Sequence, residues 1–232
     1  MSRIFLTGDL HAEPARLWDF DKLDLGLTKE DIVIVLGDFG FIWSNKERTI
    51  KILEALGETL DYTLAFVDGN HENFELIEEL ETVEEWNDGF VGKLPGGILH
   101  LLRGEIYNIG GKRIGVCGGA NSVDLWYRKE HISWWKEEDI TDEQIDNFML
   151  NLNNDNDLDV MLSHTCPAEI LPLVALYSDA NGKNVPVRNS EAQLEKINEI
   201  INVPKWYFGH WHLDLELDKK FTVMYQLFRE VL

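Results

Sequence analysis

The stretch Phe66-Val67-Asp68-Gly69-Asn70-His71-Glu72 ends an apolar run with a glycine and then places three polar side chains in a row. The apolar residues 64–67 predict a buried strand, and the glycine predicts its end. In open α/β proteins, ligands bind at the carboxyl ends of the strands. An amide, an imidazole and a carboxylate at that edge therefore indicate a functional site more than a packing role.

Similar strand ends recur along the chain, and helical patterns separate those in its first third. Between residues 45 and 60 the apolar residues Ile50, Leu53, Leu56 and Leu60 have the spacing of an amphipathic helix. We expect strands over 4–7, 32–36 and 64–67 and helices over 14–20, 45–60 and 74–86. This alternation predicts an α/β fold with parallel strands joined by crossover helices.

The pattern changes after Gly89, where Gly or Pro separates short apolar runs. Runs at 90–92, 98–102, 105–109 and 113–117, with a hairpin at Gly110-Gly111, predict an antiparallel meander and so a second or a mixed sheet. In the remainder we expect strands over 159–162 and 205–208, helices over 142–152, 168–177 and 191–201, a polar loop over 178–189, and a terminal hairpin of 213–217 and 221–227. We expect residues 1–232 to form one domain.

The chain of 232 residues is strongly acidic, with 42 Asp and Glu against 21 Lys and Arg and a net charge of −21. Such a surface repels nucleic acid and anionic membranes, so neither is an expected partner. A phosphate substrate would need a cation inside the site, which is a first indication of bound metal. Cys117 and Cys166 lack zinc-type spacing and are expected to be buried free thiols. Neither a signal peptide nor a membrane span is evident, so we expect a cytoplasmic protein.

Five predicted strand ends carry Asp, Asn or His side chains. They are Asp9 and His11, Asp38, Asn70 and His71, His164, and His210 and His212. A lone histidine after a strand is more often structural, and Gly-Asp is a common turn or helix cap. The joint occurrence favours a metal centre instead. The set exceeds the roughly four ligands of one tetrahedral ion and suits two divalent ions about 3.5–4 Å apart, drawn from Mn, Fe, Zn, Co or Ni.

The order of these motifs resembles the calcineurin-like metallophosphoesterases. That family's signature is Asp-x-His, Gly-Asp, Gly-Asn-His-Asp/Glu, a later His and Gly-His-x-His, and all five are present between residues 8 and 212. The resemblance implies a four-layer α/β/β/α sandwich of two mixed sheets with flanking helices. It also implies an enzyme that hydrolyses a phosphomonoester or phosphodiester, in a small molecule or a macromolecule, with manganese among the suitable ions.

The resemblance also implies roles for individual residues. Asp9, His11 and His212 would bind one metal, Asn70, His164 and His210 the other, and Asp38 would bridge the two. A hydroxide bridging the ions would be the nucleophile. His71 would face the substrate, stabilise the phosphoryl oxygens in the transition state and protonate the leaving alkoxide. Glu72 would orient His71, or would be a helix N-terminal acid favoured by the dipole.

Three features depart from the family pattern or leave alternatives open. Ala12 stands where the family commonly has Gly, which is tolerated if the backbone there has ordinary dihedral angles. The segment 39–41 lacks the Asp-Arg-Gly continuation of the Ser/Thr protein phosphatases, which argues against that activity. Trp211 would pack beside the site or form a wall of the substrate pocket.

The segment 122–138 follows another predicted strand end and should also lie at the active edge. Arg128 would bind the substrate phosphate or would pair with Asp124, four residues earlier. Trp134-Trp135 would stack on a nucleobase or cover the core. Two other functions share the motifs or the chemistry: a catalytically silent binding or adaptor module of this fold, and a two-metal peptidase or amidase. The complete ligand set argues against the first, and the motif order argues against the second.

Overall fold

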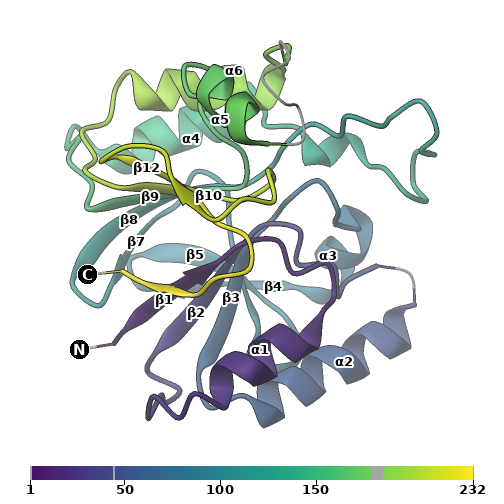
Figure 1. The fold of residues 1–232 in the computed structure, drawn as a ribbon. Helices are drawn as coiled ribbons and strands as arrows, with labels where there is room; N and C mark the ends of the chain where they lie inside the picture. Colours follow the sequence, from purple (N-terminus) through teal and green to yellow (C-terminus); the bar gives the residue numbers. More distant parts are fainter. Residues whose placement is uncertain (1, 44, 179–184, 232) are drawn as a thin grey trace.

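The protein packs two β-sheets face to face and covers the outer face of each with helices, as a computed structural model shows for residues 2–43, 45–178 and 185–231 (Figure 1). Sheet A has the strand order β13-β1-β2-β3-β6-β5-β4, and sheet B has the order β11-β12-β10-β9-β8-β7. Both sheets are mixed, because antiparallel strands flank a parallel centre in each. This arrangement confirms the predicted four-layer α/β/β/α sandwich.

The elements have the following bounds. Sheet A contains β1 (Ile4–Thr7), β2 (Ile32–Leu36), β3 (Thr63–Val67), β4 (Thr82–Trp86), β5 (Gly89–Lys93), β6 (Leu99–Leu101) and β13 (Arg229–Glu230). Sheet B contains β7 (Ile106–Ile109), β8 (Lys112–Cys117), β9 (Val160–Ser163), β10 (Trp206–Phe208), β11 (Leu215–Glu216) and β12 (Phe221–Val223). The helices are α1 (Pro14–Asp21), α2 (Lys46–Thr59), α3 (Phe74–Leu80), α4 (Asp142–Leu152), α5 (Leu171–Tyr177) and α6 (Asn189–Asn198).

Three apolar layers hold the four structural layers together. Alternate residues of a strand point to opposite faces, so Leu6 and Ile34 enter the layer between the sheets, whereas Phe5 and Val33 pack under the helices of sheet A. The layer between the sheets also contains strand residues of sheet B, among them Val116. A third layer joins sheet B to α4, α5 and α6. Each fully buried aliphatic side chain contributes about 1.5–3 kcal/mol, so these layers dominate the stability of the fold.

The parallel centres of the sheets determine where the site lies. In sheet A, β1, β2 and β3 are neighbours and parallel, and in sheet B, β8, β9 and β10 are neighbours and parallel. The residues that follow these strands therefore leave each sheet along one edge. Contacts described below join the two edges, so both sheets contribute to one site.

The expected helix over 74–86 is wrong in its second half. Helix α3 ends at Leu80, and residues 82–86 form β4, which pairs with β5. Asn87 and Asp88 join these strands with φ angles of 48° and 71°, values that Asn and Asp tolerate better than most residues. The turn signal Asn87-Asp88-Gly89 outweighs the acidic helical pattern before it.

The expected antiparallel meander is also wrong as a single unit. The hairpin at Gly110-Gly111 is confirmed between β7 and β8, but β5 and β6 belong to sheet A and β7 and β8 to sheet B. Tyr107 links the two sheets here, since its hydroxyl donates to Phe90 O at 2.6 Å and accepts from Leu102 N at 2.9 Å. A run of short strands does not reveal where the chain changes sheets.

The C-terminal part follows the prediction with one addition. The terminal hairpin is confirmed by the antiparallel pair β11 and β12, and the chain then returns to sheet A, where β13 pairs with β1. Of the expected polar loop over 178–189, residues 179–184 lie outside the described residues. Cys117 and Cys166 are buried free thiols as predicted.

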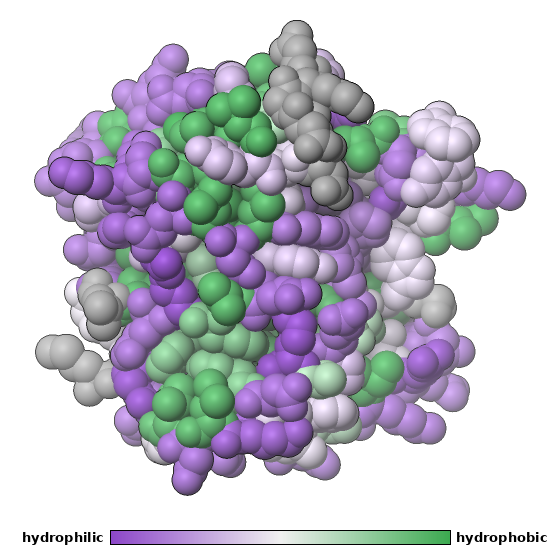
Figure 2. Space-filling view, viewed as in Figure 1, coloured by the Kyte–Doolittle hydropathy of each residue, from purple (hydrophilic) through white to green (hydrophobic). Residues whose placement is uncertain are grey.

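The helices and the surface bear on which partners the protein could contact. No helix in the described part of the chain is long and apolar enough to cross a membrane. On the face shown in Figure 2, hydrophilic side chains cover much of the surface and hydrophobic ones form separate patches.

Candidate metal centre

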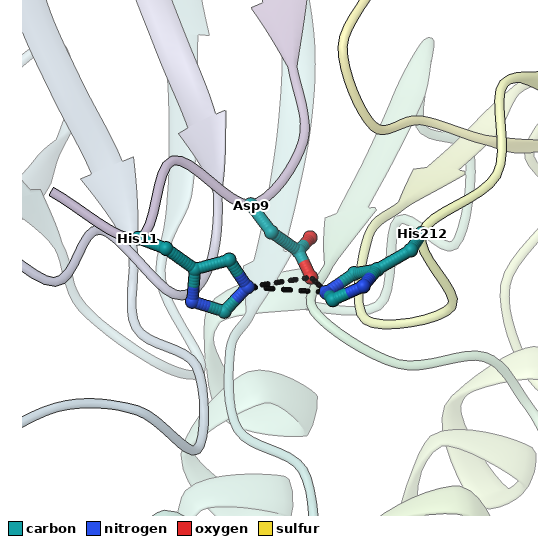
Figure 3. Close-up of side chains that lie close together, drawn as sticks. All are labelled: Asp9, His11 and His212. Atoms are coloured by element: carbon teal, nitrogen blue, oxygen red, sulfur yellow. Dashed lines mark hydrogen bonds and ion pairs between the residues drawn. The ribbon is translucent and has the colours of Figure 1, made fainter. Parts of the chain in front are cut away.

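Asp9, His11 and His212 converge from the ends of β1 and β10, and thus from both sheets (Figure 3). His212 Nε2 lies 3.1 Å from Asp9 Oδ2 and 3.1 Å from His11 Nε2. His11 Nε2 lies 4.0 Å from the same Asp9 oxygen. Two ring nitrogens and one carboxylate oxygen therefore face a common point, as three ligands of one ion would.

A second group surrounds Asp38, which follows β2. His164 Nε2 lies 3.2 Å from Asp38 Oδ1 and 3.2 Å from Asn70 Oδ1, and the His210 ring lies 5.1 Å from the His164 ring, centroid to centroid. The other oxygen of Asp38 lies 3.8 Å from His11 Nε2 in the first group. Asp38 therefore stands between the two groups, and all seven predicted ligands lie in one cluster.

These residues fit divalent metal ions. Asp9 Oδ2 is buried and accepts no well-aligned hydrogen bond from the described residues, and the ring nitrogens of His212 and His11 lie 3.1 Å and 4.0 Å from it. A buried carboxylate charge is costly unless a cation offsets it. Carboxylate, amide and imidazole groups are the ligands that borderline divalent ions prefer. His164 Nδ1 donates to Leu36 O at 2.7 Å, which directs Nε2 towards the oxygens of Asp38 and Asn70. Nε2 and these two oxygens thus face a common point that a proton or a metal ion could occupy.

Backbone strain accompanies the convergence of the ligands. His11, Asp38, His210 and His212 have φ angles of 47°, 48°, 67° and 50°, in the left-handed region that residues other than Gly rarely adopt. Such conformations cost about 1–3 kcal/mol each and cluster at functional sites. Ala12 has a φ of 59°, so its backbone does not have the ordinary dihedral angles that the substitution of Gly requires.

Two glycines allow the ligand loops to approach one another. A Cβ on Gly37, whose φ is +91°, would lie 2.0 Å from His164 Nδ1, and a Cβ on Gly69 would lie 2.2 Å from Asp38 Oδ1. The glycine that precedes each of these motifs is therefore a requirement of packing, not only of the turn.

The residues of the opening stretch have different partners. Asp68 points away from the cluster and binds Arg103 Nε at 2.7 Å. Asn70 belongs to the cluster, and the backbone N–H of His71 donates to Asp38 Oδ1 at 2.8 Å. Glu72 is buried and accepts from Phe39 N at 2.7 Å. Glu72 therefore stabilises the loop of Asp38. The sequence suggested that Glu72 orients His71, and the structure shows a different partner.

Charge and burial set the protonation of the buried imidazoles. Burial, followed by the neighbouring His164, lowers the pKa of His210 to about 3, so His210 is neutral and has a lone pair free. Burial opposes charge on His164 as well, but the facing Asp38 raises its pKa to about 9. Burial would raise the pKa of Asp38, yet His164 holds it well below its usual range. The carboxylate of Asp38 is therefore charged and is stabilised by a cationic neighbour.

Arg128 forms one of the two contacts considered from the sequence, the ion pair with Asp124, and also contacts His71. Its Nε lies 2.6 Å from Asp124 Oδ1, which is the expected ion pair, and its Nη2 lies 2.9 Å from His71 Nε2. A guanidinium only donates, so His71 Nε2 accepts this hydrogen bond. Burial is the main cause that lowers the pKa of His71, and the charge of Arg128 lowers it further. His71 is thus a neutral base in this arrangement.

A cavity of about 400 Å³ gives access to the cluster. Its lining includes Asp38, Asn70, His71, Val123, Arg128 and Trp211. Trp211 also packs against the core of sheet B, so it packs beside the cluster as one of the two sequence expectations had it. Trp135 is buried and contacts Trp43 edge to face, as expected of a core residue. A larger, mostly apolar cavity of about 570 Å³ lies beside α1 and α2 and contains none of the predicted ligands.

Sequence reasoning missed two contacts of the cluster. Ser122 Oγ accepts from Asn70 Nδ2 at 3.1 Å, and Glu138 binds Ser122. The Gly118-Gly119 strand end placed Ser122 at the correct edge, but the sequence contains no signal for its partner.

Comparison with known proteins identifies one family. Residues 2–214 match the family described as calcineurin-like phosphoesterase, and this range contains every residue of the cluster. No curated protein matches the chain.

The close approach at Gly37 predicts a large loss of stability in Gly37→Ala. Gly111 is the matched control, because its φ is +81° and an added Cβ would have no described atom within 4 Å. Gly111→Ala should cost about 1–2 kcal/mol for the left-handed backbone alone, and Gly37→Ala about 3 kcal/mol or more, because His164 must also move. Urea unfolding of the metal-free proteins measures both. Equal losses would show that His164 does not pack against Gly37.

Proposed function

Because the chain belongs to the calcineurin-like phosphoesterase family, we propose that it is a dinuclear metal-dependent phosphoesterase acting on a phosphomonoester or phosphodiester. The observation that carries this proposal is the convergence of seven ligand side chains from the strand ends of both sheets, with Asp38 between the two groups. A structural role for one such residue is ordinary, but a packing role for all seven is not.

The ligands divide between the two ions as follows. Asp9, His11 and His212 would hold one ion, Asn70, His164 and His210 would hold the other, and Asp38, which lies between the two groups, would serve both. Two divalent ions at this site would supply positive charge for the phosphoryl group and lower the pKa of water towards neutrality. Their charge also offsets the repulsion of a phosphate by a chain with net charge −21. Manganese is the ion we propose for the first assays.

His71 and Arg128 act on the substrate in this proposal. Arg128 holds the His71 ring in place and carries a positive charge at the wall of the cavity. A phosphate that enters beside Arg128 draws hydrogen bonds from the guanidinium and leaves His71 Nε2 free. The negative charge of the phosphate also favours protonation of His71. His71 then stabilises a phosphoryl oxygen and protonates the leaving alkoxide.

The proposal predicts metal-dependent hydrolysis of simple phosphate esters. The purified protein, stripped of metal with a chelator and reloaded with Mn²⁺, should bind two equivalents and hydrolyse bis-p-nitrophenyl phosphate or p-nitrophenyl phosphate. Asp38→Asn should lose most of this activity, because a neutral amide stabilises two cations less than a carboxylate does. Elemental analysis and a colorimetric assay measure both. Two bound ions without turnover of a broad phosphate-ester panel would instead favour a silent binding module.

The two cavity residues should affect turnover differently from a nearby surface cation. His71→Ala should keep both ions and lose about 10²–10⁴-fold in kcat, the usual contribution of a general acid. Arg128→Ala should mainly raise KM. Lys129→Ala, which removes an exposed positive charge one residue away, should change neither. Full activity of His71→Ala would exclude the role proposed for His71. An equal rise of KM in Lys129→Ala and Arg128→Ala would show that Arg128 acts only through long-range charge.

A further inference from the structure

We propose that Ser122 and Glu138 are positioning residues that fix the side-chain amide of Asn70 with its oxygen towards the metal site. This inference rests on the proposed function, since it concerns Asn70 as a ligand. It assigns a role to the base of the segment 122–138, which neither the family match nor the metal ligands explain.

A buried chain of hydrogen bonds joins the three residues. Asn70 Nδ2 donates to Ser122 Oγ at 3.1 Å. Ser122 Oγ lies 2.7 Å from Glu138 Oε2, and the backbone N–H of Ser122 donates to Glu138 Oε1 at 2.7 Å. Asn70, Ser122 and Glu138 are 6%, 1% and 2% exposed, so water does not compete for these bonds.

The number of protons determines the direction of the chain. Ionised Glu138 only accepts, so the single hydroxyl proton of Ser122 is donated to it. Ser122 Oγ can then only accept from Asn70, and an accepting partner selects the NH₂ group of the amide. The amide oxygen therefore faces His164 Nε2, 3.2 Å away, where the second ion would bind. A flipped amide would direct two N–H protons at a cation.

Ser122 and Glu138 lie at the two ends of the segment 122–138, and the fold holds these ends together beside Asn70. Ala120 N donates to Glu138 O at 3.1 Å, so the ends of the segment 122–138 meet at Asn70. The segment projects from the body in Figure 1, and its exposed side chains include Trp126 and Tyr127. Arg188 Nη1 donates to Ser122 O at 2.8 Å and secures the base from the side of α6.

The same segment thus contacts the site at two points. At its base, Ser122 and Glu138 hold Asn70, and further along, Arg128 reaches His71. Ser122 and Glu138 are buried and do not line the cavity, so they act through Asn70 and not on the substrate.

Glu138→Gln tests the direction of the hydrogen bonds with almost no change of shape. The Gln oxygen is expected to accept from Ser122 N, so its NH₂ group must donate to Ser122 Oγ. The hydroxyl proton is then free to point at Asn70 and favours the flipped amide. The control is Glu137→Gln, which removes the same charge one residue away, where Glu137 is half exposed.

The first readout is metal binding by calorimetry at about pH 8. Burial raises the pKa of Glu138, so a pH well above the ordinary pKa of a glutamate is used to keep it ionised. Wild type and Glu137→Gln should bind two Mn²⁺ with equal affinities. Glu138→Gln should keep one site unchanged and bind the second ion about 10–100-fold more weakly, the usual effect of losing a partner of a metal ligand. Ser122→Ala should show the same selective loss, and Ser122→Thr, which restores a hydroxyl, should recover it.

The second readout needs no metal. In the metal-free proteins at a pH above about 9, where His164 Nε2 has lost its proton and can accept a hydrogen bond, NMR should detect the Asn70 side-chain NH₂ protons close to Ser122 in the wild type and close to His164 in Glu138→Gln. An Asn70 amide with the same orientation in both proteins, or full second-site affinity in folded Glu138→Gln, would overturn this inference. An equal loss in Glu137→Gln would also overturn it, since charge alone would then explain the effect. Failure of the wild type to bind two ions would overturn the dinuclear proposal, while the NMR readout would still decide the orientation of Asn70.

Discussion

Two buried carboxylates, Asp9 and Asp38, lie close together where the strand ends of the two sheets meet, and the rest of the site depends on offsetting their charge. Burying an unpaired carboxylate is costly, so such groups pair with cations or bind metals. Imidazoles from both sheets surround the pair, and His164 is the closest to Asp38. The fold brings these acids together through two parallel strand sets, close-packed glycines and several residues with left-handed backbones. Bringing these acids together therefore destabilises the fold unless cations offset their charge. This cost is consistent with a site that binds metal ions.

Much of this arrangement could be predicted from the sequence because strand ends have local signals. An apolar run that stops at Gly or Ser and then at Asp, Asn or His identifies both the strand and the candidate ligand, and the structure brings the seven candidates predicted in this way into one cluster. The alternation of strands and helices predicted the parallel strands, and the family resemblance implied the four layers. The missed elements depended on pairing partners that are distant or that compete locally. The local pattern of residues 82–86 is typical of a helix, but pairing with β5 makes them a strand. Strand β13 pairs with β1, which lies at the other end of the chain.

The roles of the supporting residues could not be predicted, because they depend on contacts in three dimensions. Glu72 follows His71 in the chain, but the turn directs its carboxylate to the backbone of the Asp38 loop. Arg128 pairs with Asp124 through Nε, which leaves another face of the guanidinium free to reach His71, 57 residues away in sequence. Spacing along a chain predicts neighbours within one helix or strand. It does not predict which loop closes over which.

The proposed chemistry depends on two ions sharing Asp38. Crystals soaked in Mn²⁺ and measured for anomalous scattering test this point directly. We expect two peaks about 3.5–4 Å apart, one among Asp9, His11 and His212 and one among Asn70, His164 and His210, with Asp38 contacting both. A single peak, or peaks away from these side chains, would contradict it.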